Sequence, residues 1–192
     1  MDPQTLRKLA FMKLLPFLMC SLIFGVGCSA LNVQKPTATV TSMAVQDVNN
    51  TGFTMNFGVD VTNPNSQALP LTAADYKVGL SGVNVVSGTA NPTSSIPAGG
   101  TESISLPVTL TYDNLLESEQ AIVQSGGNVP YNLDAGLSFD SGVPLLGTIR
   151  VPLQYNGTLA VKDIVNNPQA LMQNPTAQKL AKELIGNMLF GH

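Results

Sequence analysis

Apolar and polar residues alternate along much of the chain, and the clearest example runs from Thr51 to Asn65. Every second position there is apolar, and these positions are Phe53, Met55, Phe57, Val59 and Val61. A period of two is typical of a strand with one face in a core and the other in water. We therefore predict a half-buried strand whose apolar face the other segments cover.

This strand is predicted to end at Asn63-Pro64-Asn65. Pro64 has no N–H and a fixed φ, so it cannot continue a central ladder. Asn63 and Asn65 can hydrogen-bond to nearby backbone and tolerate left-handed conformations, so the tripeptide predicts a turn. We interpret Asn63 as a structural residue that closes the strand.

Further alternating segments are predicted to be strands at 38–48, 76–86, 101–112, 129–139 and 149–155. A break in phase near Ser42 indicates a bulge, and Ser87-Gly88 indicates a turn after the second segment. Pro70 and Pro107 lack a backbone donor, so we expect the piece Leu69–Leu71 at a sheet edge and Pro107 at an edge or bulge. The composition of Asn91–Gly100 predicts a loop.

Between the strands, residues 113–125 change to helical spacing. Asn114 followed by Glu117 suggests a capping box, and Gly126 suits the position after the helix. The pattern predicts an all-β, immunoglobulin- or fibronectin-III-like antiparallel sandwich of about seven strands with one inserted short helix.

A C-terminal helix is predicted to begin at the N-cap Asn174 and the first-turn Pro175. Its apolar stripe consists of Ala177, Leu180, Ala181, Leu184, Ile185 and Met188. We favour docking of this helix on the sandwich, while binding to a partner or a membrane surface is the alternative.

Residues 1–28 have the pattern of an export segment, with a basic start followed by the apolar run Leu14–Gly27. That run would span about 21 Å as a helix, less than the hydrocarbon core of about 30 Å. Residues Gly25–Ser29 resemble a bacterial lipobox, which predicts acylation, including palmitate, at Cys28. An uncleaved anchor over 9–26 and an ordinary cleaved signal are the alternatives.

Charged residues make up only 11% of the chain, and the net charge is −3. Three of the nine basic residues lie in the export segment, so no basic stripe is left to bind nucleic acid. Both cysteines, Cys20 and Cys28, also lie there, so the remainder has no disulfide and no cysteine metal site.

The chain lacks the side chains that most catalytic sites require. The single histidine is the last residue, His192, so a nucleophile would have no histidine base. Asp60, Asp134 and Asp140 are interpreted as solvated surface, because Asp134 and Asp140 would lie about 20 Å apart along a strand. A calcium site of loop carboxylates stays an alternative. We expect no enzyme activity and no cofactor.

The strand ending in Asn63-Pro64-Asn65, the following Leu69-Pro70-Leu71 and the strand with Tyr76 together resemble the WHy domain of the type 2 late embryogenesis abundant (LEA) proteins. The resemblance covers roughly residues 36–159. It implies a β-sandwich with one inserted helix, which protects proteins or membranes during desiccation and uses no cofactor.

The expected organisation is a lipoprotein signal peptide (1–28), a tether (29–36), a WHy-like sandwich (37–159) and a helical extension (160–192). We expect a cell-envelope lipoprotein held in the membrane through Cys28, in the outer membrane and facing the periplasm, that meets client proteins under water stress. The alternative is an adaptor subunit of an envelope assembly that binds a protein partner. A ligand between the sheets is also compatible with such a sandwich.

Overall fold

The computed structural model of the chain describes residues 33–143, 147–165 and 173–190. Internal contacts divide the chain into two compact units, Met1–Val33 and Gln34–His192. The predicted export segment with Cys28 lies outside the described residues, as does His192. All strands described below belong to the second unit.

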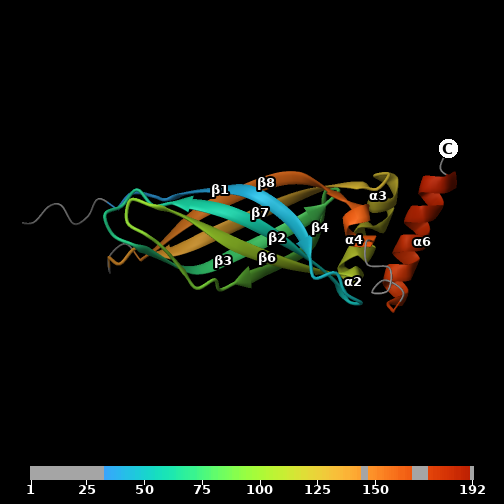
Figure 1. Ribbon diagram of the computed structural model, residues 1–192, viewed down its shortest axis with the longest axis horizontal. Helices are drawn as coiled ribbons and strands as arrows, with labels where there is room; N and C mark the ends of the chain where they lie inside the picture. The colour runs from blue at the N-terminus through green and yellow to red at the C-terminus, as the bar shows by residue number, and fades with distance from the viewer. Residues whose placement is uncertain (1–32, 144–146, 166–172, 191–192) are drawn as a thin grey trace, which may run out of the picture. The chain divides into compact units, whose positions relative to one another are not determined.

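Two antiparallel sheets form this unit (Figure 1). The smaller sheet has the order β1-β2-β6, and the larger has the order β4-β3-β7-β8 with β5 paired to β3. The strands are β1 Thr37–Gln46, β2 Gly52–Thr62, β3 Leu69–Leu80, β4 Val83–Ala90, β5 Ser94–Ile96, β6 Thr101–Thr111, β7 Asn128–Asp140 and β8 Thr148–Ala160. The predicted all-β antiparallel sandwich is confirmed, with β5 added inside the predicted loop 91–100.

The inward faces of the two sheets form one core. All five predicted apolar residues of β2 are buried, with at most 1% of their surface exposed. Phe57 of β2 meets Tyr131 of β7 edge-on, with ring centroids 6.0 Å apart. Burial, and after it the neighbouring Tyr155, raises the pKa of Tyr131 to about 12. The phenol therefore stays neutral at any ordinary pH and acts as a core aromatic.

The hairpin between β3 and β4 turns at Ser81-Gly82, so the predicted turn at Ser87-Gly88 was wrong. Ser81 and Gly82 have φ of 48° and 86°, which is the mirror-image geometry of a two-residue hairpin loop. Gly88 instead lies inside β4 opposite Tyr76, and a Cβ there would come 2.7 Å from the Tyr76 hydroxyl oxygen. Ser81-Gly82 therefore forms the turn, whereas Gly88 allows β4 to pack closely against Tyr76.

Replacing Ser81 with Asn is expected to stabilise the protein by about 0.5–1 kcal/mol, because Asn tolerates positive φ and favours this turn type. The Ser81 hydroxyl oxygen is buried and has no hydrogen-bond partner, so its loss breaks no hydrogen bond. Thermal denaturation measures the change. A lower midpoint for Ser81→Asn than for the wild type would contradict it.

Three other local predictions had mixed outcomes. The register of β1 shifts between Val40 and Ser42, which confirms the bulge, and Pro107 lies on the edge strand β6 as expected. Leu69 and Pro70 pair with β5 alone, so the expected edge position holds for these two residues, whereas Leu71 also pairs with β7. Pro70 is tolerated there because it pairs with Ser95 of β5 one residue before the ladder with β7 begins.

The inserted helical segment consists of α2 Tyr112–Leu115, the 3₁₀ turn Leu116–Ser118 and α3 Glu119–Gln124. Its capping box lies one turn earlier than predicted. The Thr111 hydroxyl accepts a hydrogen bond from the backbone N–H of Asn114, and Asn114 Oδ1 accepts one from the backbone N–H of Thr111. The last residue of β6 thus supplies the cap. Gly126 follows α3 with φ of 61°, as predicted.

Two helices follow β8, namely α4 Val161–Val165 and α6 Pro175–Phe190. Asn174 Oδ1 accepts hydrogen bonds from the amides of Thr176 (2.8 Å) and Ala177 (3.1 Å), which confirms the predicted cap. Ala177 and Leu180 are buried, so the first turns of α6 dock on the sandwich. The side chains of Leu184, Ile185 and Met188 lie outside the described part.

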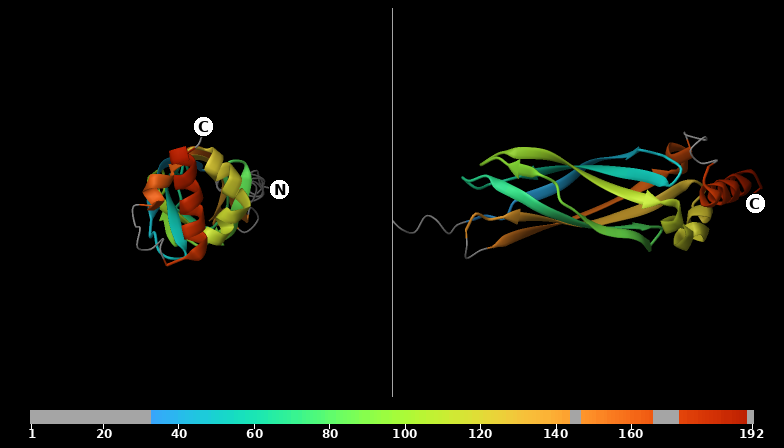
Figure 2. Two further views of the ribbon diagram at one scale, coloured as in Figure 1. Left: turned by 90° about the vertical axis from the view of Figure 1, so that its right-hand side faces the viewer. Right: turned by 90° about the horizontal axis from the view of Figure 1, so that it is seen from below.

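The helices α2, α3, α4 and α6 gather at one end of the sandwich, which we call the helical end (Figures 1 and 2). Two polar contacts fasten α6 there: the Thr176 hydroxyl donates to Asp113 (3.0 Å), and Lys179 pairs with Glu119 (2.9 Å). None of the helices in the described ranges is long and apolar enough to cross a membrane.

Candidate functional site

The Asn63-Pro64-Asn65 turn forms a compact group of buried hydrogen bonds at the end of the sandwich opposite the helices. Asn63 has no exposed surface. Its Nδ2 lies 2.7 Å from the carbonyl oxygen of Gln67, 3.1 Å from that of Pro97 and 3.3 Å from that of Ile96. One side chain therefore holds two loops that are far apart in the sequence.

The acceptor side of the same amide reaches Asn65. Asn63 Oδ1 accepts hydrogen bonds from the backbone N–H of Asn65 (3.0 Å) and from Asn65 Nδ2 (2.9 Å). The first of these bonds makes the turn that Asn favours. Pro64 between them is exposed and makes the chain leave the ladder of β2.

Asn65 also fixes the point where the chain enters the sandwich. Its Nδ2 donates to the backbone carbonyl oxygen of Gln34 (2.8 Å), and its Oδ1 accepts a hydrogen bond from the backbone N–H of Gln34 (2.6 Å). These paired bonds imitate one step of a β-ladder. We call the hydrogen-bonded group of Asn63, Asn65 and Gln34 the Asn clamp. No local pattern in the sequence indicates Gln34, since it lies 31 residues before its partner.

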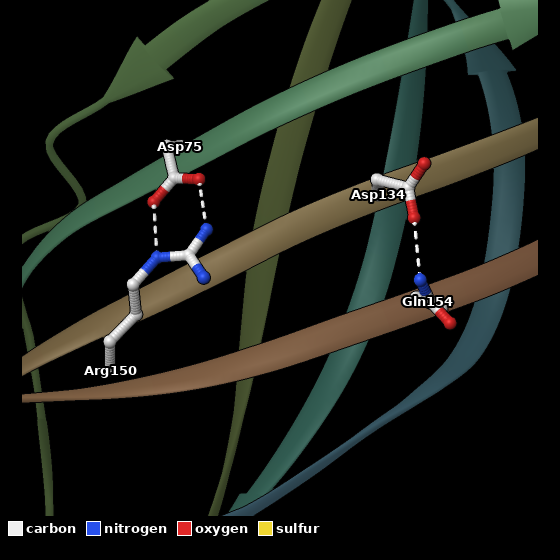
Figure 3. Close-up of polar contacts among 4 residues, drawn as sticks. All are labelled: Asp75, Asp134, Arg150 and Gln154. Atoms are coloured by element: carbon white, nitrogen blue, oxygen red, sulfur yellow. Dashed lines mark hydrogen bonds and ion pairs between the residues drawn. The ribbon is translucent and has the colours of Figure 1, made fainter.

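The outward face of the larger sheet carries the clearest charged contact (Figure 3). Arg150 of β8 reaches across β7 to Asp75 of β3, with its Nε 3.2 Å from Oδ1 and its Nη2 2.5 Å from Oδ2 of that carboxylate. Gly136 of β7 makes this crossing feasible, because a Cβ there would lie 2.2 Å from the guanidinium carbon. Beside it, Gln154 donates to Asp134 (2.9 Å).

The hydrogen bond from Arg150 lowers the pKa of Asp75 below its ordinary value of 3.8. A carboxyl whose folded pKa is depressed stabilises the fold fully above its unfolded pKa, and this contribution is lost as the pH falls through the folded value. Both side chains are about half exposed, so solvent screens the pair and the contribution is small.

Arg150→Gln is therefore expected to lower the unfolding midpoint slightly at neutral pH and by progressively less below about pH 4. Thermal denaturation at several pH values measures this, with Lys182→Gln on α6 as a charge-matched control. A deficit of Arg150→Gln that stays constant down to pH 2 would show that the ion pair is not its cause.

The acidic residues named from the sequence do not converge on one site. Asp134 and Asp140 point out from the same strand, whereas Asp60 lies on the smaller sheet and accepts a hydrogen bond from Ser103 (2.6 Å). Within the described residues, no cluster of three or more His, Cys, Asp or Glu side chains could hold a metal ion. Asp60 and Asp134 thus form cross-strand pairs on the surface, and Asp140 accepts a hydrogen bond from the backbone N–H of Gly142 in the following turn.

A small apolar cavity lies at the helical end, with a volume of about 40 Å³. Its walls come from the sandwich, from α2 to α4 and from α6, and include Phe53, Leu80, Tyr112, Ile164 and Leu180. Burial raises the pKa of Tyr112, whose hydroxyl donates to the carbonyl oxygen of Asn49 (3.1 Å). The exposed walls of this cavity are apolar, so they offer no polar group that would orient a ligand.

Together, the sheets and the hydrogen-bonded turn define a β-sandwich domain whose buried polar groups connect loops. The family described as late embryogenesis abundant protein matches residues 58–157. The chain belongs to this family, in its type 2 branch, as the sequence pattern suggested.

Curated relatives agree with this assignment. The chain is 28% identical over 128 residues to late embryogenesis abundant protein Lea14-A of Gossypium hirsutum, covering 67% of this chain and 83% of the relative. It is 29% identical over 128 residues to the desiccation protectant protein Lea14 homolog of Glycine max, covering 67% and 82%.

Solved structures show the same fold. The solution structure of the late embryogenesis abundant protein At2g46140.1 superposes with a TM-score of 0.54 at 26% identity, covering 69% of this chain and 75% of the other. That of AT1g01470 from Arabidopsis thaliana gives a TM-score of 0.57 at 24% identity, covering 71% and 88%.

Proposed function

We propose that this chain is a non-enzymatic water-stress protein of the WHy type, which stabilises other proteins or membranes when water is withdrawn. The observation that carries this proposal is the family match across the sandwich, since the relatives that share it have desiccation-related names. The chain needs no cofactor for such a role.

The geometry of the described part supports this proposal. The Asn clamp ties separate loops and the start of the domain into one body. Three outward carboxylates, those of Asp60, Asp75 and Asp134, are paired with side chains of other strands. A scaffold held by such contacts keeps its surface groups in place when bulk water is lost.

The proposal includes a lipid anchor on Cys28. Two or more acyl chains give stable membrane attachment, whereas a single chain is marginal. Only the residues between Cys28 and Gln34 would separate the lipid from the Asn clamp, a reach of about 20 Å when extended. The lipid would then sit in the outer membrane and hold the sandwich close to its periplasmic surface.

Desiccation survival tests the protective role. A strain without the gene is expected to lose viability on drying relative to wild type, and the intact gene should restore it. A Cys28→Ala gene should restore it only in part if anchoring matters, and the mass of the purified protein shows whether Cys28 is acylated. Equal survival of the deletion strain would refute protection.

A second candidate function is an adaptor in an envelope assembly. The outer surface of α6, with exposed Lys182 and Glu183, favours it because this helix is already ordered and docked. Cross-linking in intact cells separates the two functions. One stoichiometric partner protein would favour the adaptor, whereas many weak contacts would favour the protectant.

A further inference from the structure

The outward face of the smaller sheet is built mainly from uncharged hydrogen-bonding side chains. Its cross-strand rows are Thr37–Thr62–Thr101, Thr39–Asp60–Ser103, Ser42–Gly58–Ser105, Ala44–Asn56–Pro107 and Gln46–Thr54–Thr109. These rows contain no Lys, no Arg and no large apolar side chain, and Asp60 is their single acid. We call this surface the hydroxyl face. The outward face of the larger sheet, by contrast, carries Asp75, Lys77, Asp134 and Arg150.

Side chains of β2 and β6 on the hydroxyl face are joined to one another. Hydroxyl oxygens of Thr62 and Thr101 lie 2.8 Å apart, and those of Thr54 and Thr109 lie 3.2 Å apart. In each pair one hydroxyl donates to the other, so the second keeps its hydrogen and both keep acceptor lone pairs. The Thr side chains are also stiff at χ1, so little rotamer freedom is left to lose on binding.

Such a surface selects a partner by charge and by hydrogen-bonding capacity. It offers donors and acceptors together with almost no charge, and its one carboxylate already accepts a hydrogen bond from Ser103 (2.6 Å). An ionic partner gains little from it, and an apolar partner finds nothing to bury. A neutral molecule that donates and accepts at regular intervals is the complementary partner.

We propose that the hydroxyl face binds an extended, neutral glycan chain. The rows from Thr54 to Thr62 repeat over about 27 Å of strand, which is much longer than a disaccharide and suits several sugar units in line. Each contact is weak while water competes, but contacts along one chain add together and strengthen as water is withdrawn. This inference rests on the proposed water-stress function and names a class of partner for it.

Titration of the isotope-labelled full chain in detergent with cellohexaose, followed through backbone amide shifts, tests the proposal. Shifts are expected on β1, β2 and β6, with millimolar affinity, and cellobiose should bind at least about tenfold more weakly. Absence of shifts, or equal shifts on the outward residues of both sheets, would overturn the proposal. Equal affinity for cellobiose would overturn the assignment to a chain.

A matched pair of variants locates the surface. Thr62→Val with Thr101→Val removes both partners of one hydroxyl pair and keeps the shape of the strand, so the fold should tolerate it. We expect it to weaken binding about fivefold. Thr148→Val with Thr158→Val makes the same change on exposed positions of β8 and should leave the affinity unchanged.

The two proposals fail separately. If drying survival depends on the protein but cellohexaose does not bind, the glycan inference is wrong and the protective function stands. If cellohexaose binds the hydroxyl face but the deletion strain survives drying as well as wild type, the protective function is wrong and the surface assignment stands.

Discussion

Replacing Asn63 with Ala is expected to lower the free energy of unfolding by about 3–5 kcal/mol, because each buried polar group left without a partner costs about 1–3 kcal/mol. The side chain amide donates towards three carbonyl oxygens and accepts two hydrogen bonds from Asn65, all without exposed surface of its own. Denaturant titration measures the loss, which should lower the thermal midpoint by about 10 °C.

Two further variants identify the cause. Asn63→Asp keeps the acceptor oxygen but directs a carboxylate at three carbonyl oxygens, so it should destabilise at least as much as Asn63→Ala. Asn156→Ala, at an exposed position of β8, should change the stability by less than about 0.5 kcal/mol. If Asn63→Ala were as mild as Asn156→Ala, the Asn clamp would not hold the loops.

Phe57→Ala is expected to cost about 3–5 kcal/mol, because it removes a fully buried aromatic side chain from the middle of β2 and leaves a cavity. The edge-on contact with Tyr131 joins the two sheets at this point, so both layers lose packing. Leu116→Ala is the control, since Leu116 is 42% exposed. Similar losses for the two variants would contradict the position of the core.

The strands were predictable because one physical rule determines them. A face that packs against a second sheet must be apolar at every second residue. β2 and β7 follow this rule along their length, and β6 follows it from Ile104 onward. The helix cap at Asn174 was also predictable, because the cap and the amides it binds are adjacent in the sequence.

Choices between equivalent local signals were not predictable. Ser81-Gly82 and Ser87-Gly88 look alike in sequence, and only the pairing of Leu80 with Val83 decides which one turns. The short strand β5 forms because its partner Leu69–Leu71 lies beside it in space, although its composition indicates a loop. Tertiary pairing decided both cases.

In the candidate site, too, features set by adjacent residues could be predicted, whereas contacts between distant segments could not. Asn63 and Asn65 could be identified as turn residues from the tripeptide alone, but their contacts with Gln34 and Pro97 join segments more than 30 residues apart. The crossing of Gly136 by Arg150 likewise depends on strand order, which only the fold supplies.

The Asn clamp fixes the end of the sandwich at which the chain enters the domain. Gln34 is bound beside Asn65, where β1 begins, and β1 then runs ten residues, or about 33 Å, to the end that carries α6. The point where the chain enters the domain and the helices that follow β8 therefore lie at opposite ends of the sandwich, with the length of β1 between them.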